Sequence, residues 1–222
     1  MRVERVLLIR HGQTDWNMEG RWQGRLSVPL NAIGRAQAQA LAEHLRGRPI
    51  RAIYSSDLSR AWETAVAIGA ALGVEPQPEE RLREFDLGIF QGFTREESLR
   101  QYPDEWAAFH ADPWDYVVPN GESRRLMQTR MWQAWEDIVA RDEGPEVVLV
   151  THGGALAPLL MKIFGETPEI KSLRFENTSV TAVERHGDGW RLAEVAVVTH
   201  LDNLDEMAVT GEIHSPSDHQ AL

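Results

Sequence analysis

Hydrophobic residues along the chain form short continuous runs that alternate with longer stretches of helical spacing. Residues 6–9 (VLLI) and 147–150 (VVLV) are wholly apolar, and such runs are typical of strands buried on both faces of a parallel sheet. Residues 52–54 predict another short strand, and residues 180–184 and 190–195 predict a hairpin around the turn sequence HGDG.

Apolar residues at steps of three and four predict two amphipathic helices in the first third of the chain. The first spans residues 31–46, and the second has its apolar stripe over residues 58–72 and stops before Gly73. Ser56 or Asp57 is expected to cap the second helix, because each has a side-chain oxygen that can accept a backbone N–H.

Three more helical stretches follow. Residues 94–112 have a helical pattern that Pro103 interrupts. The Trp, Tyr and Phe side chains of this stretch either cover a pocket or simply pack, and packing is favoured. Apolar positions within 127–138 predict a helix that ends near Gly144, and another helix follows the second apolar run and ends at Phe164.

The alternation of strands and helices predicts an α/β layered fold with a largely parallel sheet. A length of 222 residues fits one domain with a continuous core, which we assign to residues 1–200. Residues 201–222 have few apolar positions and mix Asp, Glu, Ser and Pro, so we expect a C-terminal tail there.

Composition and charge narrow the classes of function. Hydrophobic residues make up 42% of the chain and charged residues 26%, which is ordinary for a soluble globular protein. The net charge of -11 repels nucleic acid and anionic membranes, so any anion site must be local. The absence of Cys excludes disulfides, thiolate nucleophiles and cysteine zinc sites. The N-terminal apolar stretch is too short for a signal peptide, and no run approaches membrane-spanning length, so we expect a cytoplasmic protein.

The two wholly apolar runs end alike, in His11-Gly12 and in His152-Gly153. Ligands of open α/β sheets bind outside the carboxyl ends of the strands, so the two histidines are expected at one site. Arg10 beside His11 suits a phosphate better than a metal ion, because a guanidinium can bind two phosphate oxygens at once. The tripeptide alone also fits an ordinary strand-to-turn junction.

The loop that follows supports a phosphate site, because it offers donors at Asn17, Arg21, Gln23 and Gly24. Other hydrolytic chemistries have less support. The eight histidines include no His-Glu-x-x-His spacing for a metallohydrolase. The sequence GES at residues 121–123 lacks the final glycine of a serine hydrolase motif. We therefore expect neither a metal ion nor a cofactor.

Four blocks of residues occur in order along the chain: LLIRHGQTDWN continuing to RWQG, then YSSDLSRAWETA, LREFDLGIFQG and VVLVTHGG. Together they resemble the histidine phosphatase superfamily, also called phosphoglycerate mutase-like. Looser matches at residues 121–123 and at NTSVT from Asn177 extend the resemblance to about His200. It implies the family's three-layer α/β/α sandwich, with residues 1–200 as a catalytic domain that acts through a phosphohistidine.

The resemblance also implies roles for individual residues. His11 would attack phosphorus through one ring nitrogen while a backbone carbonyl holds the other. Arg10 and Arg60 would hold the phosphoryl oxygens, and His152 would stabilise their charge during transfer.

A leaving alkoxide needs a proton, and the resemblance assigns its delivery to Glu84, with Asp86 as a nearby competitor. Gly153 and Gly154 open a helix, so their backbone N–H groups are expected to add to the anion site.

Two departures from the family pattern bear on the reaction. The family's mutases carry an inserted segment with an adjacent arginine pair that holds the substrate's second acidic group, and this chain lacks it. Arg124-Arg125 do not replace that pair, because they follow residues 121–123 and start a helix. Ser27 stands where many relatives have Asp before the Pro-Leu pair, which bears on the loop or on substrate fit.

These features favour hydrolysis of a small-molecule phosphate monoester over transfer between hydroxyls. A cofactor-dependent phosphoglycerate mutase and a non-catalytic relative that binds phosphorylated ligands remain as alternatives. Neither nucleic acid nor a membrane is an expected partner, and a homodimer is compatible with the sequence.

Overall fold

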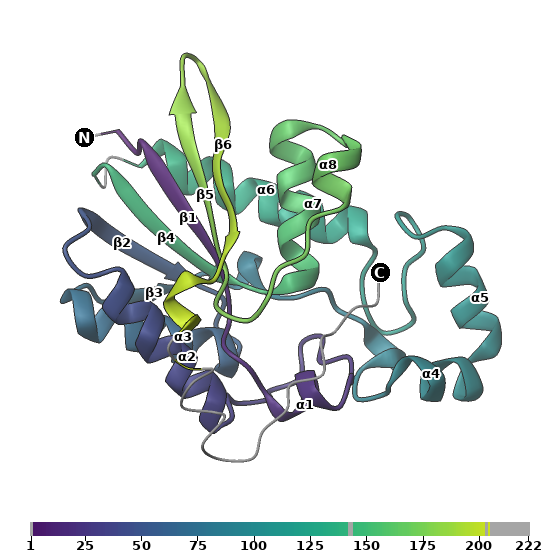
Figure 1. Cartoon of the computed structure of the whole chain (residues 1–222). Coiled ribbons are helices and arrows are strands. Elements are labelled where there is room, and N and C mark those ends of the chain that lie inside the picture. Colours follow the sequence, from purple (N-terminus) through teal and green to yellow (C-terminus); the bar gives the residue numbers. More distant parts are fainter. Residues whose placement is uncertain (1, 142–143, 203, 205–222) are drawn as a thin grey trace.

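The structure, a computed structural model, describes residues 2–141, 144–202 and 204. The tail assigned to residues 201–222 lies almost wholly outside the described residues, so that boundary stays a prediction. Figure 1 shows a central twisted sheet with helices on both of its faces. The strands are β1 (Arg5–Arg10), β2 (Ile50–Ser55), β3 (Pro76–Pro78), β4 (Glu146–Thr151), β5 (Val180–His186) and β6 (Gly189–Val197). The helices are α1 (Asp15–Met18), α2 (Ala32–His44), α3 (Ser59–Leu72), α4 (Arg95–Gln101), α5 (Pro103–Ala111), α6 (Arg124–Ala140), α7 (Gly153–Phe164) and α8 (Pro168–Lys171).

Within the described residues the strand order of the sheet is β3-β2-β4-β1-β5-β6. β1 pairs in parallel with β4, β4 with β2, and β2 with β3. β5 is antiparallel to both β1 and β6, so it alone runs against the other strands. The predicted α/β fold with a largely parallel sheet is therefore confirmed.

The apolar run of β1 shows why this strand lies in the middle of the sheet. Val6 and Leu8 belong to one buried cluster, whereas Leu7 and Ile9 belong to the other. Successive side chains of a strand point to opposite faces, so a run without polar residues is covered on both sides. Helices α2 and α3 cover one face and α6 and α7 cover the other (Figure 1), which gives the expected three layers.

Two helix boundaries differ from the sequence prediction. The N-cap of α3 is Leu58, which makes no side-chain cap hydrogen bond, so the predicted cap at Ser56 or Asp57 is wrong. Both side chains bind elsewhere: Asp57 pairs with Arg83, and the Ser56 hydroxyl lies 2.8 Å from a ring nitrogen of His152.

Helix α6 ends at Ala140 rather than near Gly144. Arg141 has an extended backbone, and its guanidinium donates to the Tyr54 hydroxyl at 2.9 Å, over the face of the Tyr54 ring. The helix therefore ends at the extended backbone of Arg141, whose side chain binds to β2.

Pro103 divides the third helical stretch as predicted, and it is the first residue of α5. The aromatic side chains there pack together: Trp106 and Phe109 are buried, and Trp22 stacks on Trp106 with ring centroids 5.2 Å apart. In the described part of the chain, no helix is long and apolar enough to cross a membrane.

Candidate active site

The two strand-end histidines meet because β1 and β4 are neighbours in register. Arg10 pairs with Thr151 across the two strands, so the next residue of each strand reaches the same edge of the sheet. The rings of His11 and His152 lie with centroids 5.1 Å apart and planes tilted by 58°. Both are buried, at 3% and 0% exposure.

The ring of His11 has a defined tautomer. Its Nδ1 lies 2.7 Å from the carbonyl oxygen of Gly12, which can only accept, so Nδ1 carries the hydrogen. Its Nε2 then has a lone pair, which accepts a hydrogen bond from Nε of Arg60 at 3.3 Å. Burial, and then the positive charges of Arg60 and Arg10, hold the pKa of His11 well below its ordinary value. The imidazole is therefore neutral at pH 7 and can act as a nucleophile.

The backbone around His11 is held by residues from three other elements. The Gly12 amide donates to the Thr64 hydroxyl of α3 at 3.0 Å, and the His11 amide donates to the Thr151 carbonyl of β4 at 3.0 Å. The Asn177 side-chain amide donates to the His11 carbonyl at 3.0 Å. Asn177 belongs to the loosely matching NTSVT segment, which thus supports the position of His11.

Arg60 projects from α3 and is 1% exposed. Besides its contact with His11, it donates from Nη1 to the Leu26 carbonyl at 3.0 Å and from Nη2 to the Gly24 carbonyl at 2.7 Å. Gly24 has a φ of 51°, which favours glycine at this turn. Burial lowers the pKa of Arg60 to about 10, so the guanidinium stays charged at neutral pH.

Arg10 and His152 lie beside this pair. Nη1 of Arg10 donates to the Phe175 carbonyl at 2.6 Å. A Cβ at Gly153 would lie 3.3 Å from Nε of Arg10, so the glycine leaves room for that guanidinium. Nε2 of His152 bonds to Ser56, whereas its buried Nδ1 has no hydrogen-bond partner among the described residues. Burial, and next the charge of Arg60, hold the pKa of His152 well below its ordinary value.

Glu84 reaches the same site from the segment between β3 and α4. Its two carboxylate oxygens accept from the backbone amides of Phe85 at 2.8 Å and of Gly154 at 3.0 Å. A Cβ at Gly154 would lie 2.7 Å from the carboxylate, so a side chain there would displace it. The Gly154 amide, expected to serve the anion site, is thus occupied by Glu84.

Asp86 points to other partners. It pairs with Arg25 at 3.4 Å and accepts from the Gly88 amide at 3.1 Å, and it does not line the cavity that Glu84 lines. Geometry therefore favours Glu84 over Asp86 as the carboxyl next to a bound substrate.

These side chains surround a cavity of about 140 Å³. Arg10, His152 and Gly153 are not among the residues that line it, whereas the other predicted site residues are. The full lining is His11, Asn17, Arg21, Trp22, Gln23, Gly24, Arg60, Glu84, Phe85, Leu87, Arg124 and Gly154.

The loop residues that line the cavity differ in whether their polar atoms already have partners within the protein. Oδ1 of Asn17 accepts from the Thr14 amide at the start of α1. Arg21 is bound to Glu19 at 2.8 Å and to Glu97 at 2.6 Å, so its charge is already balanced. Gln23 is 7% exposed, and its buried Oε1 has no partner within the described residues.

Comparison of the sequence with models of protein families shows which family the chain belongs to. The family model "Histidine phosphatase superfamily (branch 1)" matches residues 6–198. The chain belongs to this superfamily. The family expected from the four sequence blocks is thereby confirmed.

The relatives of this chain include proteins named as phosphatases. It is 36% identical over 201 residues to Phosphoglycerate mutase-like protein 4 of Arabidopsis thaliana, covering 89% of this chain and 86% of the plant protein. It is 35% identical over 206 residues to the metal-independent phosphoserine phosphatase of the same plant, covering 91% and 85%. The solved structure of a mycobacterial glucosyl-3-phosphoglycerate phosphatase in complex with VO3 has a TM-score of 0.77 and 35% identity, covering 88% of this chain and 100% of that one.

Sequence reasoning missed several residues of this candidate site. Ser56 was interpreted as a helix cap, yet it lies inside the second family block beside His152. Trp22, Phe85 and Leu87 form apolar walls, and each lies inside one of the four family blocks. Membership of a block is therefore the signal that could identify them. Arg124, which the sequence does not assign to the site, also lines the cavity.

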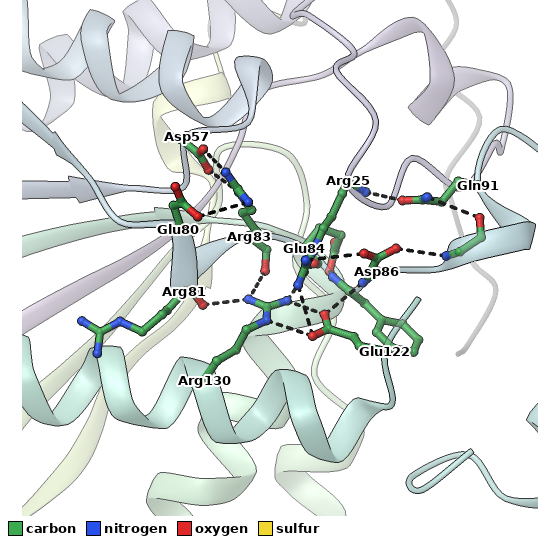
Figure 2. A network of polar contacts seen from close by, with 12 residues as sticks. Arg25, Asp57, Glu80, Arg81, Arg83, Glu84, Asp86, Gln91, Glu122 and Arg130 are labelled. Atoms are coloured by element: carbon green, nitrogen blue, oxygen red, sulfur yellow. Dashed lines mark hydrogen bonds and ion pairs between the residues drawn. The ribbon is translucent and has the colours of Figure 1, made fainter. Parts of the chain in front are cut away.

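A network of polar contacts around Arg130 and Glu122 holds the segment that contains Glu84 (Figure 2). Arg130 of α6 donates to the carbonyls of Arg81 at 2.7 Å, Arg83 at 2.6 Å and Glu84 at 2.8 Å. It also pairs with Glu122 at 2.6 Å.

Glu122 extends this network beyond Arg130. Its carboxylate accepts from the Asp86 amide at 3.0 Å and from Nη2 of Arg25 at 3.1 Å. The network thus fixes the backbone on both sides of Glu84 to helix α6.

Replacing Arg130 with methionine is expected to destabilise the fold by about 2–4 kcal/mol, because Glu122 keeps only the longer of its two arginine contacts among the described residues and three carbonyls lose a donor. Urea unfolding measures the effect. Arg125→Met is the matched control on the same helix: within the described residues Arg125 pairs with exposed Asp115 and lies over the Trp114 ring at the surface, so its loss should destabilise the fold much less. Equal losses in the two variants would contradict the structural role of the network.

The buried histidines predict a loss of stability on mild acidification. The folded-state pKa values of His11 and His152 lie well below the ordinary value, and burial together with the charge of His44 lowers the pKa of His200 to about 4. In the unfolded chain these rings take up protons as pH falls below about 6.5. The unfolded state then binds more protons, so each ring lowers stability by up to about 1.4 kcal/mol per pH unit.

Above about pH 7 these rings are neutral in both states and contribute no pH dependence. Urea unfolding at pH 7.5 and pH 5.5 therefore tests the expected decrease. His200→Asn should reduce the slope, because one of the contributing rings is removed. The interpretation fails if the free energy of unfolding is the same at the two pH values.

Proposed function

We propose that this protein hydrolyses phosphate monoesters of small metabolites through a phosphohistidine formed on Nε2 of His11, without a metal ion. The observation that carries the proposal is the arrangement of a neutral His11, with its Nε2 lone pair next to Arg60 and its ring in the cavity that Glu84 also lines.

In the first step, the Nε2 lone pair forms a bond to phosphorus while the bond between phosphorus and the ester oxygen breaks. Arg60 releases its hydrogen bond to Nε2 and donates to a phosphoryl oxygen instead, with Arg10 and His152 stabilising the same charge. Glu84, in its protonated form, gives its proton to the leaving oxygen, so the alcohol departs neutral.

In the second step, water attacks the phosphohistidine and the bond between Nε2 and phosphorus breaks. The Glu84 carboxylate takes a proton from the water, which restores its acid form for the next cycle. Inorganic phosphate is released, and His11 returns to its starting tautomer.

Hydrolysis is favoured over mutase activity by the missing basic insertion and by relatives named as phosphatases. The plant phosphoserine phosphatase is also named as metal-independent, which agrees with an attack by imidazole alone. A small-metabolite substrate fits the cytoplasmic location expected from the sequence.

The test is a phosphate-release assay of the full chain over a panel of phosphorylated metabolites, with and without a metal chelator. We expect turnover that the chelator leaves unchanged. Loss of activity with chelator would overturn the metal-free mechanism. Efficient interconversion of 3-phosphoglycerate and 2-phosphoglycerate with a bisphosphoglycerate primer would favour the mutase instead.

A further inference from the structure

Arg124 is a cavity residue whose guanidinium has aromatic neighbours but no hydrogen-bond acceptor among the described residues. It is the first residue of α6, and its Cζ lies 5.1 Å from the ring centroid of Phe109 and 5.8 Å from that of Phe85. Among residues 2–141, 144–202 and 204, no hydrogen bond or ion pair engages its side chain. Its neighbour Arg125, in contrast, is exposed and pairs with Asp115.

The isolation of Arg124 has an energetic cost that a ligand would offset. Its side chain is partly buried, and burial lowers the pKa of the guanidinium. Glu84 is the carboxylate whose charge acts on it, yet both Glu84 oxygens accept from backbone amides. A desolvated cation without an acceptor is unfavourable, so this guanidinium is suited to binding an anion that enters the cavity.

The position of Glu84 indicates which part of the substrate Arg124 meets. The Glu84 charge acts on Arg60 as well as on Arg124, and all three line one cavity with His11. In the proposed reaction His11 and Arg60 contact the phosphoryl group, and Glu84 contacts the leaving oxygen. Arg124 therefore faces the part of the substrate beyond that oxygen.

We propose that Arg124 binds a carboxylate on the leaving group, so that the preferred substrates are phosphate monoesters of small hydroxy acids. This inference rests on the proposed function and names its substrate class. A guanidinium presents its N–H groups in a planar fork that matches the two oxygens of a carboxylate. The rings of Phe85 and Phe109 support the side chain that presents this fork.

Charge and size both favour a carboxylate over a second phosphate. A second phosphate would bring about two negative charges to one guanidinium, which matches the single charge of a carboxylate better. Arg21 cannot balance the excess, because Glu19 and Glu97 already occupy it. The cavity of about 140 Å³ suits a small acid. The chain lacks the mutase insertion, but it still has a cation that can bind a second acidic group of the substrate. That cation is Arg124 at the start of α6.

The test compares two substrates that differ in one group: 3-phosphoglycerate has a carboxylate where glycerol 3-phosphate has a hydroxymethyl group. The wild-type protein should prefer 3-phosphoglycerate in kcat/KM. Arg124→Gln should lower kcat/KM for 3-phosphoglycerate by about 10–100-fold, mainly through KM. Its effect on glycerol 3-phosphate should stay within about threefold, since that substrate has no charge for Arg124 to bind.

Arg125→Gln is the matched control, since it removes the adjacent arginine from the exposed side of the same helix. It should leave both substrates unchanged. Equal losses on the two substrates in Arg124→Gln would overturn the inference, and so would a wild-type preference for a bisphosphate of similar size over 3-phosphoglycerate.

Failure of this inference is distinguishable from failure of the proposed function. If the wild-type protein hydrolyses nitrophenyl phosphate but does not discriminate between the paired substrates, the carboxylate subsite is wrong and hydrolysis stands. If it hydrolyses no monoester, the proposed function is wrong. Calorimetric binding of 3-phosphoglycerate to the wild-type protein and to Arg124→Gln then still tests the subsite, and equal affinities would overturn it.

Discussion

Replacement of His11 by glutamine is expected to reduce phosphate release by about 10⁴-fold or more, the range in which removal of a nucleophile affects other covalent enzymes. Glutamine keeps a polar side chain of similar length but has no nitrogen lone pair that can attack phosphorus. The neutral state of His11 and its Nε2 position beside Arg60 are the reasons for assigning the nucleophile to this ring.

The measurement pairs initial rates with a direct search for the intermediate. Rapid quenching in base should trap an acid-labile phosphoryl group on the wild-type protein and none on His11→Gln. His186→Gln is the control, because His186 is exposed at the end of β5. Retention of more than a tenth of the activity in His11→Gln, or an unchanged phosphoenzyme, would contradict the assignment.

The sequence predicts the central part of this site well because the site depends on the sheet. A run of four apolar residues before His11 is typical of a strand buried on both faces, and the same holds before His152. Once both runs are parallel strands, their ends meet at one edge. The prediction of a shared site therefore needed the hydrophobic pattern and no knowledge of side-chain packing.

Other contacts depend on distances that no local pattern contains. The Ser56 hydroxyl could cap a helix or bind a distant side chain, and its contact with His152 spans 96 residues of sequence. The Gly154 amide opens a helix, as predicted, but whether it meets a phosphate or Glu84 depends on how the segment from β3 to α4 folds back.

The position of Arg124 in the cavity also could not be predicted from the local sequence. Its place in the sequence argues against equivalence with the mutase arginine pair, because it follows residues 121–123 and starts a helix. The N-terminus of α6 nevertheless packs beside Phe85 and Phe109 and brings Arg124 into the cavity. The order of segments along the chain shows whether a segment is equivalent to one in the family. It does not show which charged side chains lie close together in the folded protein.

Replacement of Glu84 by glutamine should slow hydrolysis in proportion to how much the leaving group needs a proton. For esters of sugar alcohols, whose alkoxides are poor leaving groups, we expect kcat to fall by about 10²–10⁴-fold. For nitrophenyl phosphate, whose phenolate leaves without protonation, the first step should change little. Rates over a series of leaving groups of graded basicity would then show a steeper dependence in Glu84→Gln than in the wild-type protein.

Asp86→Asn is the matched control for this experiment, because it alters a carboxylate two residues away that pairs with Arg25 and does not line the cavity. Its effect should be small and equal for all leaving groups, since it acts through loop packing rather than proton transfer. The reverse pattern, with a leaving-group-dependent loss in Asp86→Asn and a uniform loss in Glu84→Gln, would transfer the general-acid role to Asp86. A uniform loss in both variants would leave water as the proton donor, and the backbone amides that hold Glu84 would then serve only to order the loop.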